Sequence, residues 1–209
     1  MTKFLFSLLF VFIPTLFFAQ EEDESCMPPD KKVEKLLIKA INAPDAKSAV
    51  TAFNEALDAA PDNATITYEY GIYAFEMAKE YFKTYPNPDM GNKSMQKAED
   101  MFESTLQLCD KYNADVYYYL GVINFSQSDN EKAISNFKLF KNYKSSDATK
   151  YSEDHSKKLA DVNEVLKDLE SEQEMLSTEV PFAPVMVKNV SSAKDATVVS
   201  YVNGNKLTH

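Results

Sequence analysis

Most of the chain alternates hydrophobic and polar residues with the period of an α-helix. From Asp30 to about Leu176, apolar residues recur at steps of three and four, and short clusters of Pro, Asn and Asp separate the segments. Segments with one apolar and one polar face are typical of helices that pack on one another. Only four glycines occur in 209 residues, fewer than phosphate loops and multi-turn β architectures usually need. The pattern predicts an all-α fold.

Two of the helical segments repeat one motif. Residues 68–75 match residues 118–125 with Tyr, Gly, a β-branched residue and Phe in register. An Ala-xxx-Phe helix follows each block, and a third such helix lies upstream: these helices carry Ala98 and Phe102, Ala133 and Phe137, and Ala49, Phe53, Ala56 and Pro61. We interpret the repeats as helical hairpins packed in series, in which Gly admits a facing helix, Ala lies at the helix crossing and Phe fills the gap to the next hairpin.

The spacing of these residues resembles the tetratricopeptide repeat. Gly121 and Ala133 are twelve residues apart, and Phe137 follows four later, as in that family. Leu37 and Thr67 depart from the family pattern, and fifteen extra residues lie between Gly71 and Ala98. The resemblance implies a solenoid of about three helical hairpins over residues 21–145.

A single long helix is expected after the third hairpin, from about Ala148 to Leu176. Its apolar residues form one seam on a charged helix, which predicts a capping segment, residues 146–178, over the open end of the repeats. A seam for a coiled-coil dimer is the alternative. Residues 179–209 are Pro-interrupted and then β-branched, and Asn203-Gly204 is typical of a type I′ hairpin turn. They predict a linker and a short β tail, the start of an incomplete β domain.

The first twenty residues have the features of a secretory signal peptide. Lys3 precedes an apolar run from Phe4 to Phe18, and cleavage is expected after Ala19, with a retained anchor as the alternative. Cys26 and Cys109, the two cysteines, would then both reach an oxidising compartment. They either form a disulfide or remain unrelated thiols.

Charge and composition exclude several functions. The chain has 22 basic residues, all of them Lys, against 32 acidic ones, and its formal net charge is −10. An acidic surface without Arg disfavours binding to nucleic acid. His155 and His209 are the only histidines, and neither has ligand spacing with a cysteine or a carboxylate pair. Nucleophile, phosphate-loop and dinucleotide motifs are missing as well. We therefore expect no enzyme, cofactor, metal site or small-molecule substrate.

The order of segments also resembles the N-terminal part of a bacterial envelope family. The resemblance rests on the signal peptide, Cys26, the run 115–121, and Val180-Pro181-Phe182-Ala183-Pro184 leading into residues 187–191. Members of that family combine tetratricopeptide repeats, a β-propeller and an OmpA-like peptidoglycan-binding domain, and some are linked to type IX secretion and gliding motility. The resemblance implies a periplasmic location or outer-membrane association through partners. The propeller and the OmpA-like domain are missing here, so a truncated remnant without independent activity is the alternative function.

The predicted function is that of a non-catalytic scaffold that holds an envelope protein or peptide. In tetratricopeptide repeats, four positions of the first helix of each hairpin line a concave groove. These positions are Thr65, Tyr68, Ile72 and Phe75 in one repeat, and Asp115, Tyr118, Val122 and Phe125 in the next. Six of the eight are apolar or aromatic, which would suit a partner helix or an extended peptide. The alternative is that these side chains pack against one another or against the helix at 148–176.

Overall fold

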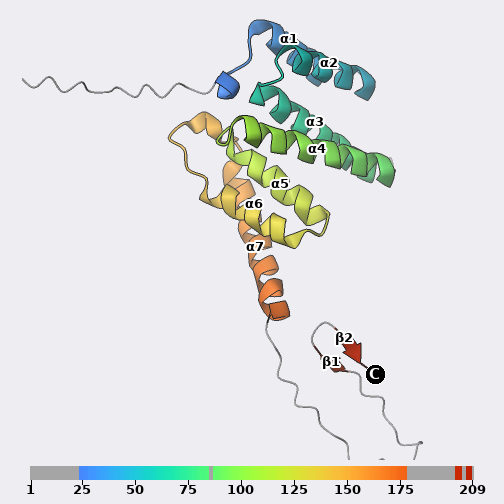
Figure 1. Ribbon diagram of the computed structural model, residues 1–209, viewed down its shortest axis with the longest axis vertical. Helices are drawn as coiled ribbons and strands as arrows, with labels where there is room; N and C mark the ends of the chain where they lie inside the picture. The colour runs from blue at the N-terminus through green and yellow to red at the C-terminus, as the bar shows by residue number, and fades with distance from the viewer. Residues whose placement is uncertain (1–23, 85–86, 178–200, 204–205, 209) are drawn as a thin grey trace, which may run out of the picture. The chain divides into compact units, whose positions relative to one another are not determined.

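The computed structural model describes residues 24–84, 87–177, 201–203 and 206–208 (Figure 1). The predicted signal peptide and most of the predicted β tail lie outside these residues. The described part is mainly helical, which confirms the all-α fold class. None of its helices is both long and apolar enough to cross a membrane.

Seven α-helices and two short 3-10 helices make up the ordered sequence of elements from residue 24 to residue 177. They are η1 Glu24–Cys26, α1 Lys31–Ile41, α2 Ala46–Ala59, α3 Ala64–Lys83, α4 Pro88–Leu108, α5 Ala114–Ser126, α6 Asn130–Asn142, η2 Ala148–Lys150 and α7 His155–Ser177. Two three-residue strands, β1 Tyr201–Asn203 and β2 Lys206–Thr208, pair antiparallel. Gly204 of the predicted turn lies outside the described residues.

The helices begin where a short polar side chain caps them. Asp30, Asp45 and Asn63 precede α1, α2 and α3, and each accepts a hydrogen bond from a backbone N–H of the first turn. Asn87 and Asn113 do the same for α4 and α5. A cap satisfies one of the free N–H groups at a helix start, so the Asn and Asp clusters between the apolar segments set the helix boundaries.

The chain divides into two compact units, one ending at Tyr112 and the other beginning at Asn113. In the first unit, α1 pairs with α2 and α3 pairs with α4. Its core holds Phe53 of α2 stacked on Tyr70 of α3, with ring centroids 4.6 Å apart. This is the role predicted for Phe53, which fills the gap to the next hairpin.

Gly71 lies where α3 meets α4. A Cβ atom built on Gly71 would be 2.8 Å from Phe102 Cε1, so only a glycine lets the Phe102 ring lie this close to the α3 backbone. Thr67, which replaces an aromatic residue of the repeat pattern, is buried and shares a 2.8 Å hydrogen bond with Thr105 across the same helix pair. The hydroxyls therefore satisfy each other where the larger ring is missing.

The second unit consists of the α5–α6 hairpin and the long helix α7. Gly121 of α5 faces the ring of Phe137 of α6, as Gly71 faces Phe102. Val162, Leu166 and Leu169 of α7 are buried against this hairpin, so the apolar seam of α7 is covered inside the unit. The helix begins at His155 rather than near Ala148, because Asp147 caps the separate short helix η2.

Candidate functional site

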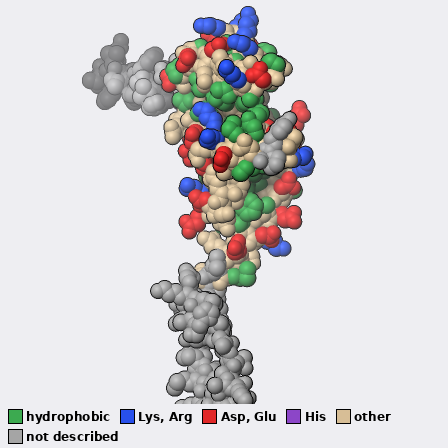
Figure 2. Space-filling view, turned by 90° about the vertical axis from the view of Figure 1, so that its right-hand side faces the viewer, with side chains coloured by type: hydrophobic (Ala, Val, Ile, Leu, Met, Phe, Trp, Pro, Cys, Tyr) green, Lys and Arg blue, Asp and Glu red, His purple; other side chains and the backbone are tan. Residues whose placement is uncertain are grey.

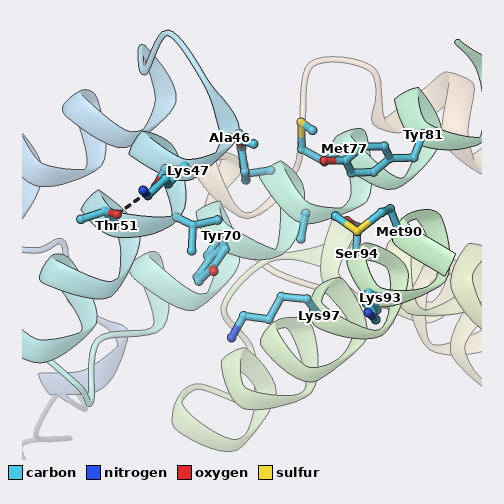
Figure 3. A pocket seen from close by; sticks show the side chains of 13 residues that line it. Ala46, Lys47, Thr51, Tyr70, Met77, Tyr81, Met90, Lys93, Ser94 and Lys97 are labelled. Atoms are coloured by element: carbon cyan, nitrogen blue, oxygen red, sulfur yellow. Dashed lines mark hydrogen bonds between the residues drawn. The ribbon is translucent and has the colours of Figure 1, made fainter. Parts of the chain in front are cut away.

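An open pocket of about 380 Å³ lies in the first unit (Figure 3). The start of α2, the second half of α3 and the first half of α4 form its walls. From α2 it is lined by Ala46, Lys47, Val50 and Thr51, from α3 by Tyr70, Tyr73, Ala74, Met77 and Tyr81, and from α4 by Met90, Lys93, Ser94 and Lys97. Its volume is at the lower end of the range usual for ligand pockets, about 300–1,000 Å³.

The extra residues of the second hairpin build this pocket. Helices α3 and α4 have 20 and 21 residues, whereas α5 and α6 have 13 each. When Gly71 is aligned with Gly121 and Ala98 with Ala133, residues 77–94 take the place of residues 127–129, a net insertion of fifteen residues. Five residues of the lining belong to it: Met77, Tyr81, Met90, Lys93 and Ser94. The insertion predicted from the repeat spacing thus adds a surface that the shorter hairpin lacks.

Tyr70 and Tyr73 form the floor of the pocket, and the ring of Phe53 packs against both. Phe53 stacks on Tyr70 and also contacts Tyr73, at a centroid distance of 5.3 Å. Burial raises the pKa of both tyrosines, and for Tyr73 the nearby Tyr81, Tyr70 and Asp45 raise it further. Both phenols are therefore neutral at physiological pH, and the floor is uncharged.

Three lysines surround this apolar floor. Lys47 extends from α2, and Lys93 and Lys97 extend from successive turns of α4 (Figure 3). The Lys97 Nζ atom lies 4.8 Å from the centre of the Tyr70 ring, within cation–π range. No Asp or Glu is among the residues that line the pocket. The local charge is thus opposite in sign to that of the whole chain.

The predicted groove residues of the first unit lie on the opposite face of α3. At about 100° per residue, Thr65, Tyr68 and Ile72 point away from the side that carries Tyr70 and Met77. The hydroxyl of Tyr112 donates a 3.0 Å hydrogen bond to Thr65, and its ring lies 5.1 Å from that of Tyr68.

Phe75, the fourth groove residue of this unit, is 6% exposed. Much of the face predicted to bind a partner is therefore in contact with its own unit. Tyr112 is neither a groove residue nor part of the helix at 148–176, so the alternative, in which the groove residues pack against one another or against that helix, stays a prediction for this unit.

In the second unit, the predicted groove residues have different environments. Asp115 is 1% exposed, and Lys158 of α7 donates a 2.5 Å hydrogen bond to its carboxylate, so this charge is engaged inside the unit rather than offered to a partner. Tyr118 contacts Phe140, and the ammonium of Lys158 lies 5.3 Å from its ring centre. Val122 packs beside the core, and only Phe125 is widely exposed, at 47%.

The eight predicted groove residues fall into the two separately described units, four in each. Within each unit the four residues lie on one helix, α3 or α5. A continuous groove through both units stays a prediction.

Lys158 makes an internal network in the second unit. Burial opposes its charge, but hydrogen bonds from its ammonium to Asp115 and Asp154 outweigh that effect and raise its pKa above the ordinary lysine value. The network is therefore an ionic connection between α5 and α7.

His155 has charged neighbours in the sequence, but aromatic rings lie beside it in the structure. It is half-buried, and its ring lies 4.8 Å from the rings of both Phe140 and Tyr151. Sequence reasoning missed this environment because the aromatic partners come from two other segments. In the described part of the chain, no three His, Cys, Asp or Glu side chains gather as a metal site would require.

Cys26 and Cys109 are joined in the structure by a disulfide, with their Cα atoms 5.3 Å apart. Cys109 is the C-cap residue directly after α4, and Cys26 belongs to η1, which also contacts α3. The Ser25 hydroxyl donates a hydrogen bond to the carbonyl of Leu108 beside it. The covalent link thus closes a loop that contains the helices α1 to α4.

Comparisons with known proteins do not assign a family. No protein-family model matches the chain, and no curated protein matches it.

Proposed function

We propose that this chain is a non-catalytic protein-binding module of the bacterial cell envelope, built from tetratricopeptide-type helical hairpins. Two hairpins use the same close contact, Gly71 with Phe102 and Gly121 with Phe137, at corresponding positions of the repeat. Hairpins of this kind stack into scaffolds whose surfaces hold peptides or other proteins. The repeat spacing and the recurring contact support this architecture.

The pocket on α2, α3 and α4 is the feature that most strongly supports a binding function. Its apolar side chains include Val50 and Met90, which are 37% and 39% exposed. On the opposite face of α3, by contrast, Thr65 and Tyr68 are engaged by Tyr112. We therefore assign the main binding surface to the pocket rather than to the eight-residue groove.

The predicted signal peptide and a disulfide in the first unit favour an oxidising, extracytoplasmic location. We propose a periplasmic position or association with the outer membrane through partners, as the family resemblance implies. Internal packing of Thr65, Tyr68 and Asp115 favours a second candidate function, a purely structural segment without a partner of its own.

Site-specific photo-crosslinking in the full chain separates these functions. A benzoylphenylalanine residue replaces Met90 in the pocket, Tyr118 in the predicted groove, or Leu139 on α6, which is 49% exposed and serves as the control. We expect a discrete crosslinked species from Met90 and none from Leu139. A crosslinked species from Tyr118 alone would show that the partner binds the predicted groove and not the pocket. If none of the three positions gave a crosslinked species, the purely structural segment would be favoured.

A further inference from the structure

The pocket of the first unit combines two kinds of surface that point to one class of ligand. Val50, Met77, Tyr81 and Met90 supply apolar area, and Lys47, Lys93 and Lys97 supply positive charge. We propose that this pocket binds an acidic peptide segment, in which one large apolar side chain enters the pocket and carboxylates on either side meet the lysines. The proposal rests on the proposed function and names the chemistry of its partner.

The charge of the pocket lining is complementary to that of an acidic ligand. Acidic residues outnumber lysines in this chain by 32 to 22, yet three lysines and no carboxylate line the pocket. Lys47, Lys93 and Lys97 form no ion pair with any carboxylate that the structure describes. Their charges are therefore available to a ligand.

The net charge of −10 does not exclude an acidic partner. At about 0.1 M salt the screening length is about 10 Å, so charges beyond the pocket contribute little. Lys47, Lys93 and Lys97 line the pocket itself, whereas the nearby Asp45 that acts on Tyr73 is not part of the lining. On the face that Figure 2 presents, hydrophobic, basic and acidic side chains are all exposed, so a lining with lysines and without Asp or Glu is a local feature.

The placement of the lysines favours a peptide over a compact anion. Lys47 lies on α2, whereas Lys93 and Lys97 lie on α4, so the lysines stand at different edges of the apolar floor (Figure 3). Phosphate is usually held by several donors that converge on one point, often Arg or the N–H groups of a helix start. A chain with carboxylates on both sides of an apolar residue matches the spacing better.

The floor of the pocket is aromatic and tightly packed. Tyr70 is 4% exposed and is held between the stacked ring of Phe53 and the ammonium of Lys97. An open pocket of about 380 Å³ with an aromatic floor admits a Leu, Met or Phe side chain rather than a whole folded domain. Binding energy would come from this burial, and orientation from the lysines.

Fluorescence anisotropy with defined peptides tests the proposal in the full, oxidised chain. The probe is a labelled peptide Asp-Glu-Leu-Asp-Phe-Glu, and the comparison peptides replace Leu and Phe by Ala, or every acid by Lys. We expect the first to bind and both comparisons to bind at least about tenfold more weakly. Added salt should weaken the binding of the acidic peptide. Equal binding of the Lys peptide would overturn the proposal.

Matched variants locate the binding at the pocket. Lys93→Glu with Lys97→Glu should raise the Kd about tenfold, because attraction becomes repulsion at two positions. Lys31→Glu with Lys35→Glu is the control, since it changes charge equally at the same spacing on α1. For the apolar part, Met90→Ser is compared with Ile38→Ser, another exposed hydrophobic residue. Circular dichroism verifies that all four variants remain helical.

Other outcomes would identify a different ligand of the pocket. Competition by inorganic phosphate, or equal binding to vesicles of anionic lipid, would replace the peptide by a different ligand and overturn the proposal. Self-association that Lys93→Glu with Lys97→Glu abolishes would make a second copy the occupant and would overturn it too. If Met90 crosslinks a partner while the lysine variants leave that crosslink intact, the proposed function stands and the acidic ligand is wrong.

Discussion

The ring of Phe137 on α6 lies directly over Gly121 on α5, so that a Cβ atom on Gly121 would be 2.5 Å from two of its ring carbons. Phe137 itself is 2% exposed and has little room to move. The absence of a side chain at residue 121 therefore sets the distance between the two helices. Gly71 and Phe102 have the same relationship in the other unit.

Gly121→Ala should destabilise the protein. Overpacking of a core typically costs about 1–3 kcal/mol, and the better helix propensity of Ala returns about 1 kcal/mol. We expect a net loss of up to about 2 kcal/mol in the free energy of unfolding, measured by urea denaturation. Ser135→Ala, an exposed change on α6, is the control and should be neutral or slightly stabilising. Phe137→Leu should cost less in the Gly121→Ala background than alone, and strictly additive effects would contradict the contact.

Loss of the disulfide should weaken the first unit. Cys26 and Cys109 are separated by 83 residues, and closing so long a loop stabilises a fold by about 2–4 kcal/mol. Cys26→Ser with Cys109→Ser should lower the thermal midpoint, and reductant should lower that of the wild type but not that of the variant. Two thiols that titrate in denatured, unreduced wild-type protein would show that the bond does not form.

The ion pair between Lys158 and Asp115 should behave as a buried unit. Lys158→Met leaves the Asp115 carboxylate uncompensated in a site that is 1% exposed, so we expect a loss of about 3–5 kcal/mol in the free energy of unfolding. Adding Asp115→Leu should recover much of this loss. The control is Lys138→Met, which removes an exposed pair with Glu170 and should cost at most about 1 kcal/mol. If the double variant lost as much free energy of unfolding as the two single variants together, the pairing would be contradicted.

Stability should fall at alkaline pH. The folded-state pKa of Lys158 is raised above its unfolded value, so its contribution is complete below about pH 10 and decreases as pH rises through the folded pKa. Burial raises the pKa of Tyr118 and Tyr112, which gives the same sign. Thermal midpoints measured from about pH 8 to about pH 11 should decrease. The decrease should be smaller in Lys158→Met, and an unchanged slope would assign it to the tyrosines alone.

Helix α7 should not mediate a dimer. Its residues Val162, Leu166 and Leu169 are buried against α5 and α6, so the seam is already covered. Leu166→Ala should lower the free energy of unfolding by about 2–5 kcal/mol without changing the mass measured by light scattering. A wild-type dimer that this variant dissociates would restore the coiled-coil interpretation.

The sequence by itself determined the helical class and the partners within each hairpin. Helical periodicity, the Asn and Asp caps, and the spacing of Gly121 to Phe137 depend on local geometry, which a linear pattern records directly. The spacing also identified the insertion between Gly71 and Ala98. A signal for the pocket was present too, since Tyr73, Met77 and Tyr81 recur at steps of four along α3.

Only the tertiary structure decided which faces are accessible. Asp115 and Tyr68 had the periodicity of surface residues, but Lys158 and Tyr112, more than forty residues away along the chain, cover them. Likewise, Lys47 and Lys97 reach one pocket only because α2 packs beside the elongated α3–α4 hairpin. Periodicity indicates which side of a helix is buried or polar, whereas the neighbour that covers that side comes from distant segments, and packing alone brings them together.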